Sequence, residues 1–216
     1  MSKKYLFSGG DLFTEEQIKV LRQDLKGKSN LVSIGAKREY EKNDKYFYGT
    51  IDTNSVEKQF SFSDLNQFSL IDGRTPRKEG LELLEKADII YLQGGDPFAQ
   101  LDYIRNNNYD KFLKDYKGII IGFSAGSMNL SKISFYSKDE DYPETCFYEG
   151  LGLVNITIDP HFDITDNSRI NELKECSLKK EIIGLPDNSL IIVDENDNII
   201  EYGANYKYSN GALRDK

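Results

Sequence analysis

Ser124 lies between two glycines at the end of an apolar run, in the segment GFSAG at residues 122–126. Residues 118–122 have the pattern of a buried strand and residues 125–130 are compatible with a helix, which predicts Ser124 at a strand-to-helix turn. Small flanking residues permit the strained backbone that exposes a nucleophilic hydroxyl in such a turn. The same pattern also occurs as an ordinary turn in which serine caps the helix, so the motif leaves both interpretations open.

The chain contains a single histidine, His161, which follows the apolar stretch 155–158. An imidazole is the usual general base near neutral pH, and His161 is the only candidate for that role. The carboxyl ends of parallel strands meet at the edge of a sheet where ligands bind. A position directly after a strand therefore favours a place in a site, although a partly buried structural histidine is the alternative.

Asp187 follows the predicted strand 181–185 in the sequence IGLPDN, which puts its carboxylate at the same edge of the sheet. A carboxylate there could orient the imidazole and stabilise its protonated form. Three other acids, Asp139, Asp159 and Asp163, compete for this role, and a Pro-Asp-Asn turn is also a common structural turn. The position after a strand favours Asp187.

Gly94 and Gly95 follow another apolar stretch, and Asp96 with the proline after it can cap and open a helix. Backbone N–H groups of such a turn, together with that of Ala125, could converge on a developing oxyanion. A nucleotide-binding loop is the alternative, but neither glycine-rich nucleotide motif is present. The sequence SGG at residues 8–10 is interpreted as a turn that shapes the same edge.

Short runs rich in Ile, Val, Leu and Tyr alternate with longer amphipathic stretches, which predicts an α/β fold with a mostly parallel sheet flanked by helices. Strands are predicted at residues 4–8, 30–35, 68–71, 88–92, 118–122, 155–158, 181–185, 190–193 and 199–202, the last two as an antiparallel hairpin. Helices are predicted at residues 14–25, with a capping box from Thr14 and Gln17, at 77–86, at 96–105 and within 37–65. Residues 131–150 are expected to form a long surface excursion over or beside Ser124.

A length of 216 residues fits one domain spanning residues 1–216. The net charge of -8, without a basic stripe, argues against nucleic acid as a partner. The apolar stretch among the first residues is too short for a secretory signal, and no run of about 18 apolar residues occurs. We therefore expect a cytoplasmic protein without a membrane partner. Cys146 and Cys176 have no Cys or His at metal-ligand spacing, which predicts free thiols and no metal site.

Four motifs in this order, GGDPF, GFSAGS, DPHF and IGLPD, resemble those of the aspartyl dipeptidase (peptidase E) and cyanophycinase family of serine peptidases, peptidase family S51. The resemblance covers roughly residues 8–203. It implies a fold similar to class I glutamine amidotransferases, which is flavodoxin-like. It also implies Ser124 as nucleophile, His161 as base and Asp187 as acid, with Gly95 and Ala125 as backbone oxyanion donors and no metal or organic cofactor.

The sequence departs from the dipeptidases at three places. Asp187 stands where they have a glutamate, Asp96 stands where they usually have an asparagine, and residues 166–170 lack an additional arginine that theirs carry. Gly94, Asp96 and Arg169 are the candidates for the substrate pocket. A carboxylate at position 96 in a protein of charge -8 disfavours acidic substrates, so we expect neutral or basic residues before the scissile bond to be cleaved faster than Asp.

These expectations combine into a cytoplasmic serine peptidase that hydrolyses small peptides through an acyl-enzyme. One alternative is a non-catalytic binding or sensor protein on the same fold. Another is an amidase or esterase that uses the same three residues. The sequence predicts no oligomeric state.

Overall fold

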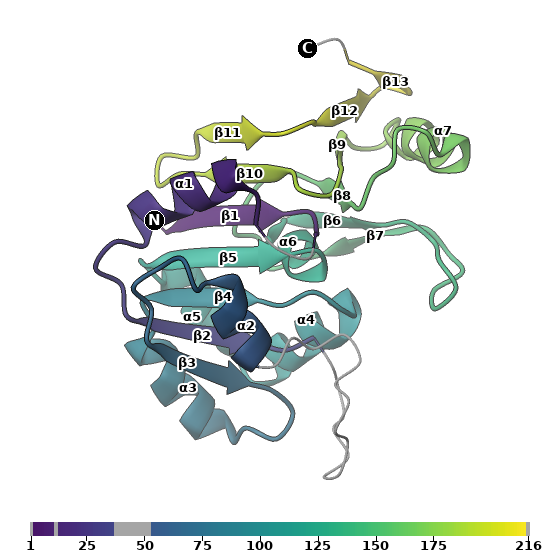
Figure 1. The fold of residues 1–216 in the computed structure, drawn as a ribbon. Coiled ribbons are helices and arrows are strands. Elements are labelled where there is room, and N and C mark those ends of the chain that lie inside the picture. The colour runs from purple at the N-terminus through teal and green to yellow at the C-terminus, as the bar shows by residue number, and fades with distance from the viewer. Residues whose placement is uncertain (1, 11–12, 37–52, 215–216) are drawn as a thin grey trace.

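The computed structural model describes residues 2–10, 13–36 and 53–214. Within them, the largest sheet has the strand order β11-β10-β1-β5-β4-β2-β3 (Figure 1). Its strands are β1 (Lys3–Phe7), β2 (Asn30–Ile34), β3 (Gln67–Ile71), β4 (Ile89–Leu92), β5 (Ile119–Phe123), β10 (Leu190–Val193) and β11 (Ile199–Tyr202). β1 to β5 pair in parallel, and β10 and β11 are antiparallel. The predicted mostly parallel sheet and the C-terminal antiparallel hairpin are confirmed.

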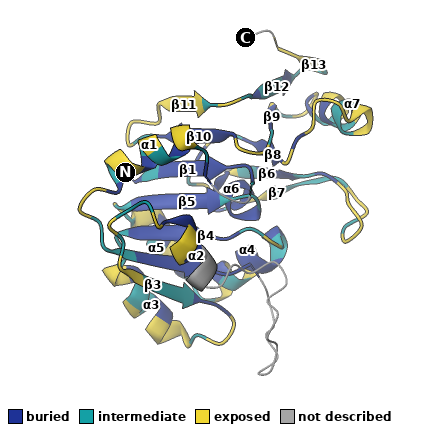
Figure 2. Cartoon of the chain, viewed as in Figure 1, coloured by how far each residue is buried: buried dark blue, intermediate teal, exposed yellow. Residues whose placement is uncertain are grey.

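Helices cover both faces of this sheet because its strands are apolar on both sides. Tyr5 and Phe7 point into a core cluster shared with Leu21 of α1 and Val56 of α2, whereas Leu6 points into a cluster shared with α3, α4, α5 and α6. The central strands are accordingly buried along their length (Figure 2). The helices are α1 (Glu15–Asp24), α2 (Thr53–Gln59), α3 (Arg77–Lys86), α4 (Pro97–Asn106), α5 (Tyr109–Asp115), α6 (Ala125–Leu130) and α7 (Asn167–Cys176).

Several helix signals in the sequence have the expected structural outcome. Thr14 and Gln17 form the predicted capping box at the start of α1, and α3 has the predicted bounds. The helix expected within residues 37–65 is α2, and residues 37–52 lie outside the described residues. The helices α5 and α7 were not predicted. The N-cap of α7, Asp166, accepts hydrogen bonds from the backbone of Ser168 and Arg169.

A second sheet has the order β13-β12-β9-β8. Its strands are β8 (Ile158–Pro160), β9 (Ile182–Leu185), β12 (Tyr206–Ser209) and β13 (Ala212–Leu213), and only the β8–β9 pair among them is parallel. The strand predicted at residues 155–158 begins later, at Ile158. The chain before it bonds elsewhere: Leu151 and Leu153 donate backbone hydrogen bonds to Asn129 and Leu130 of α6.

The surface excursion expected at residues 131–150 is instead a β-hairpin of β6 (Ile133–Tyr136) and β7 (Cys146–Glu149). The side chain of Phe135 in this hairpin is fully buried and packs against Phe147, with 5.3 Å between the ring centroids. The charged tip between the strands hid this short alternating pattern in the sequence. In the described part of the chain, no helix combines the length and apolar character needed to cross a membrane.

Candidate active site

The two sheets present their carboxyl ends to the same place. β1 and β5 run parallel, and Phe7 pairs with Phe123 at their carboxyl ends. Ser124 is therefore the first residue beyond this edge of the large sheet. β8 and β9 are also parallel and end in register, so His161 and Asp187 both follow the end of the second sheet. The predicted convergence of side chains at strand ends thus arises from two sheets rather than one.

Ser124 has the backbone of a nucleophile elbow, with φ 49° and ψ -112°. Such a conformation costs a non-glycine residue about 1–3 kcal/mol. The flanking glycines permit it by close approach: a Cβ on Gly122 would lie 2.7 Å from the backbone nitrogen of Ser127, and one on Gly126 would overlap the carbonyl of Leu92. The glycines are therefore required for α6 to pack directly on β4 and β5, and the hydroxyl is presented at the turn.

Three predicted side chains form one hydrogen-bonded series. Ser124 Oγ lies 2.7 Å from His161 Nε2, and His161 Nδ1 lies 2.7 Å from Asp187 Oδ1. A proton on Nδ1 donated to Asp187 leaves Nε2 free to accept the serine hydroxyl proton. The histidine and aspartate side chains are about half exposed, at 52% and 53%. Such an exposed pair adds little to stability, so its effect is to orient the imidazole.

The competing acids have other partners. Asp159 is bound by Arg169. Asp163 accepts hydrogen bonds from the backbone and hydroxyl of Thr165. Asp139 accepts hydrogen bonds from the backbone of Asp141 and Tyr142 and from the hydroxyl of Tyr136. Of the four candidate acids, Asp187 is therefore the one that forms a hydrogen bond with the imidazole of His161.

Ser8 and Gly9 support this series, and the sequence analysis interpreted them only as part of a turn. Ser8 is fully buried; its Oγ donates to Leu185 O at 2.5 Å and accepts from the backbone N–H of His161 at 2.8 Å. A Cβ on Gly9 would overlap Cε1 of His161 and lie 2.5 Å from Asp187 Oδ1. The available signal was their position after the first strand, at the same edge as the other motifs.

A pocket of about 410 Å³ opens beside Ser124 and His161. Among the predicted oxyanion and pocket residues, Gly95, Ala125 and Arg169 line it. The backbone N–H groups of Gly95 and Ala125 thus belong to residues on the wall next to the serine. The β6–β7 hairpin contributes to another wall through Tyr136, Ser137 and Asp139, so the expectation that residues 131–150 lie beside the serine holds.

Two predicted pocket residues, Gly94 and Asp96, are not part of the described lining. Asp96 is the N-cap of α4, where its carboxylate accepts a hydrogen bond from Ala99 N at 2.9 Å. The hydroxyl of Tyr142 donates to its other oxygen at 2.9 Å. These bonds turn the carboxylate toward the helix and the hairpin and away from the role in substrate contact that the sequence suggested.

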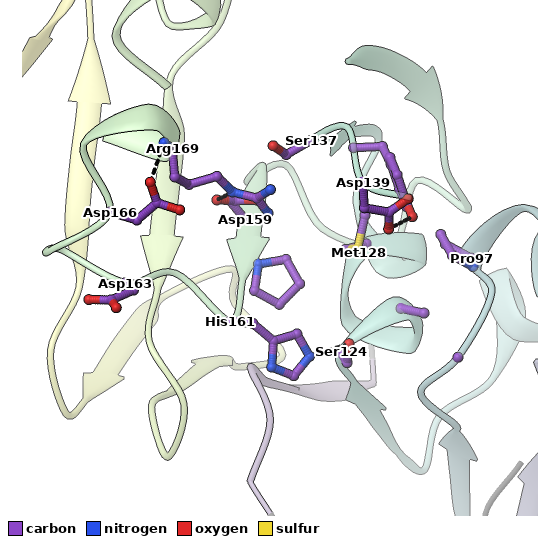
Figure 3. Close-up of a pocket in the computed structure, with 14 residues that line it drawn as sticks. Pro97, Ser124, Met128, Ser137, Asp139, Asp159, His161, Asp163, Asp166 and Arg169 are labelled. Atoms are coloured by element: carbon purple, nitrogen blue, oxygen red, sulfur yellow. Dashed lines mark hydrogen bonds and ion pairs between the residues drawn. The ribbon is translucent and has the colours of Figure 1, made fainter. Parts of the chain in front are cut away.

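The buried acid of the pocket is Asp159, which is 1% exposed. Arg169 reaches it from α7 with two hydrogen bonds, from Nε at 2.8 Å and from Nη2 at 2.6 Å (Figure 3). Burial raises the pKa of Asp159 to about 6, since desolvation of the carboxylate outweighs the attraction of Arg169. Both residues line the same pocket as Ser124.

Among the residues that the structure describes, neither cysteine is grouped with other side chains that could hold a metal ion. Cys146 and Cys176 are free thiols, and partial burial raises the pKa of each. Within residues 2–10, 13–36 and 53–214, no group of three or more His, Cys, Asp or Glu side chains is arranged to hold a metal ion.

The family model described as peptidase family S51 matches residues 49–200, which is more than half of the chain. Among solved structures, a protein from Listeria monocytogenes EGD-e described as a "Putative Peptidase E Protein" is similar, with a TM-score of 0.67 and 20% identity over 94% of this chain and 98% of that chain. At this identity the likeness shows the fold alone. No curated protein matches the chain. Because this match covers more than half of the chain and includes Ser124, His161 and Asp187, the chain belongs to peptidase family S51.

Proposed function

We propose that the protein is a serine peptidase that hydrolyses a peptide bond in small peptides through Ser124, His161 and Asp187. The observation that carries this proposal is the continuous hydrogen-bonded series from the serine hydroxyl to the aspartate, with 2.7 Å at each step. The strained elbow at Ser124 supports it, because strain of this kind is concentrated at functional sites. Membership of a peptidase family supports a peptide bond as the target.

In the proposed acylation step, Ser124 Oγ attacks the carbonyl carbon of the scissile bond while His161 Nε2 takes the hydroxyl proton. Asp187 keeps Nδ1 protonated and stabilises the imidazolium. The carbonyl oxygen becomes an oxyanion, for which the backbone N–H groups of Gly95 and Ala125 are the proposed donors. The C–N bond then breaks, and the leaving amine takes the proton from His161.

Deacylation repeats the same steps with water as the nucleophile. Water attacks the ester carbonyl of the acyl-enzyme and passes a proton to His161 Nε2. The bond to Ser124 Oγ breaks, and the histidine returns its proton to the serine. The half-exposed histidine supports this step, because solvent reaches the imidazole from the pocket.

The dimensions of the pocket support a short substrate. Its volume of about 410 Å³ lies in the range of small-ligand sites. Two walls come from the start of α4 and from the β6–β7 hairpin, and the hydrogen bond from Tyr142 to Asp96 joins them. The size of the pocket and these two walls favour a peptide of two or a few residues over a segment of a folded protein.

A fluorophosphonate probe tests the proposal, with the labelled residue located by mass spectrometry. We expect one adduct on Ser124. Ser124→Ala and His161→Ala should each lower kcat for peptide hydrolysis by about 10⁴- to 10⁶-fold, because such residues act as a unit. The matched control is Ser168→Ala, an exposed serine of α7, which should keep full activity.

The other outcomes separate the alternatives. An unlabelled Ser124 in a folded protein would contradict the proposal and favour a binding or sensor protein. Labelling at Ser124 with hydrolysis of esters or side-chain amides, but of no peptide in a dipeptide and tripeptide panel, would favour the amidase or esterase.

A further inference from the structure

The pocket beside Ser124 is strongly acidic. In the described part of the chain its lining includes the carboxylates of Asp139, Asp159, Asp163 and Asp166 and one guanidinium, that of Arg169. With His161 neutral, four carboxylates against one guanidinium leave a formal charge of -3. This charge lies on the walls of a cavity that contains the proposed nucleophile, so it acts directly on any group attached to the reacting carbonyl.

The other three carboxylates, those of Asp139, Asp163 and Asp166, accept hydrogen bonds from uncharged donors. Asp163 and Asp166 accept hydrogen bonds from backbone N–H groups of the residues that follow them, and Asp139 accepts from backbone N–H groups at the tip of the hairpin. Bonds of this kind favour the ionised form of a carboxyl group and leave its negative charge in place. Burial acts to raise the pKa of Asp139, but the hydrogen bond from the Tyr136 hydroxyl, these backbone bonds and the attraction of Arg169 together hold it below its usual value. For Asp163 the hydrogen bonds from Thr165 lower the pKa.

The single guanidinium does not balance this charge, because Asp159 already occupies it. The two hydrogen bonds from Nε and Nη2 of Arg169 engage both oxygens of a carboxylate that is 1% exposed. A bidentate pair of this geometry uses the planar fork with which arginine would bind a carboxylate of a substrate. Figure 3 shows the arginine turned from α7 onto Asp159. Glu172, one turn further along α7, adds more negative charge near Asp159.

We infer that this pocket takes a positively charged side chain of the residue that supplies the scissile carbonyl, and that the Asp159–Arg169 pair is the determinant that excludes acidic side chains. The inference rests on the proposed function, because it is the acylation of Ser124 that places this side chain in the pocket. A lysine or arginine side chain would be attracted by the carboxylates of Asp139, Asp163 and Asp166. Arg169, the cation of the described lining, is bound to Asp159. An aspartate or glutamate side chain would be repelled by the same carboxylates, and the arginine that could bind it is already paired with Asp159.

The test compares kcat/KM for four dipeptides that share a C-terminal leucine. Lysine and norleucine at the first position have similar stems and differ in the side-chain charge, and glutamine and glutamate form the second pair. All four carry the same α-ammonium group, so each ratio reports the side chain alone. We expect lysine to exceed norleucine, and glutamine to exceed glutamate, each by about tenfold or more, the size expected of an uncompensated charge in a partly enclosed site.

Three variants separate the arginine from the general charge. Asp159→Asn frees Arg169 and should raise the glutamate-to-glutamine ratio by about tenfold or more, as expected for a charge pair shielded from water. Asp163→Asn removes the same unit of charge from the wall but leaves Arg169 paired, and should change that ratio by less than about threefold, as for an exposed charge. The double variant Asp159→Asn/Arg169→Gln keeps the formal charge of -3, so it should keep the preference for lysine and gain nothing for glutamate.

Circular dichroism establishes that each variant is folded, and if Asp159→Asn does not fold, the wild-type ratios and the double variant decide. Equal rates for lysine and norleucine, or glutamate at least as fast as glutamine, in an enzyme whose Ser124 is labelled by the fluorophosphonate would overturn this inference and leave the proposed function standing. Equal shifts in Asp159→Asn and Asp163→Asn would overturn the role of the pair. Absence of both labelling and cleavage would overturn the proposed function, and the inference with it.

Discussion

Ser124 stands on the large parallel sheet, whereas His161 and Asp187 stand on the smaller sheet of β8, β9, β12 and β13. Close packing in the core positions the serine. Its turn lies where α6 packs on β4 and β5, and a Cβ on Gly122 or Gly126 would overlap neighbouring backbone atoms. The histidine and aspartate are half exposed and are positioned by a few polar contacts. The comparison teaches that packing sets the position of the nucleophile, while the junction between the sheets sets the position of the base and the acid.

Ser8 and Gly9 form that junction. Both belong to the turn after β1 in the large sheet, yet their contacts are with His161, Asp187 and the end of β9. The backbone adds one more link, from Asn188 N to Gly9 O at 3.1 Å. Changes at this junction should therefore alter catalysis more than stability, whereas equal changes inside the large sheet should alter stability alone.

The largest effect is expected from the acid of the smaller sheet. Asp187→Asn keeps the size of the side chain but no longer holds a protonated Nδ1, so kcat should fall by about 10³- to 10⁴-fold while the fold is kept. The matched control is Asp163→Asn, which removes another exposed carboxylate close to His161 in the sequence; it should change kcat little for the norleucine–leucine dipeptide, whose side chain has no charge for Asp163 to attract. Steady-state kinetics on a cleaved dipeptide measure both. If the control lost more activity than Asp187→Asn, the assignment of the acid would move to Asp163.

The next effect comes from Gly9→Ala. The added methyl group would overlap the imidazole of His161, and the His161–Asp187 pair must move to admit it. Displacement of a catalytic group by about 1 Å lowers rates by about 100-fold, and we expect a loss of kcat of that order with unchanged binding. Gly152→Ala is the control, since nothing lies within 4 Å of its added Cβ and its positive φ of 72° carries only a backbone cost. An active Gly9→Ala enzyme would show that the pair is not held as tightly as its contacts indicate.

A smaller change is expected from Ser8→Ala. The variant leaves the backbone N–H of His161 and the buried carbonyl of Leu185 without this hydroxyl, which should destabilise the fold by about 1–3 kcal/mol and lower kcat several-fold. Ser33→Ala is a close match within the large sheet, because Ser33 is also buried and its hydroxyl also donates one bond and accepts one.

Urea unfolding and kinetics on the two serine variants distinguish the regions. Both should lose similar stability, but only Ser8→Ala should lose activity. An equal loss of activity in Ser33→Ala would mean that the junction has no special role and that both serines act through general stability.

The two regions also differ in how far the sequence predicted them. The strands β1, β4 and β5 were found to within about a residue, since strands buried on both faces appear as continuous apolar runs. The site residues Ser124, His161 and Asp187 were found because each directly follows such a run. β12 was missed because its sequence, YKYS, is short and half polar, although it places the buried Tyr208 between two partly buried polar residues.

What the sequence could not provide is the pairing of side chains between elements. Arg169 was predicted as a pocket residue, but its bidentate bond to Asp159 depends on α7 packing against β9 and β12, and α7 itself has too polar a sequence to be predicted. Ser8 likewise gives no sign in its own sequence that it bonds Leu185, 177 residues away. Contacts of this kind follow from tertiary structure, which local patterns do not encode.

The smallest effect is a change of stability at the nucleophile itself. At φ 49° and ψ -112°, Ser124 is strained because it carries a Cβ, and glycine would relieve that strain. Against a relief of about 1–3 kcal/mol stands the larger conformational entropy that glycine loses on folding, about 0.5–1 kcal/mol. Ser124→Gly should therefore unfold at higher urea concentration than Ser124→Ala, with a difference of about 1 kcal/mol, although both are inactive. The control is Ala125→Gly one residue later, inside α6, where no such strain exists and glycine should destabilise by about 0.5–1 kcal/mol. Opposite signs at neighbouring positions would establish that the large sheet holds its serine in a strained turn, and a Ser124→Gly protein less stable than Ser124→Ala would show that the turn is relaxed.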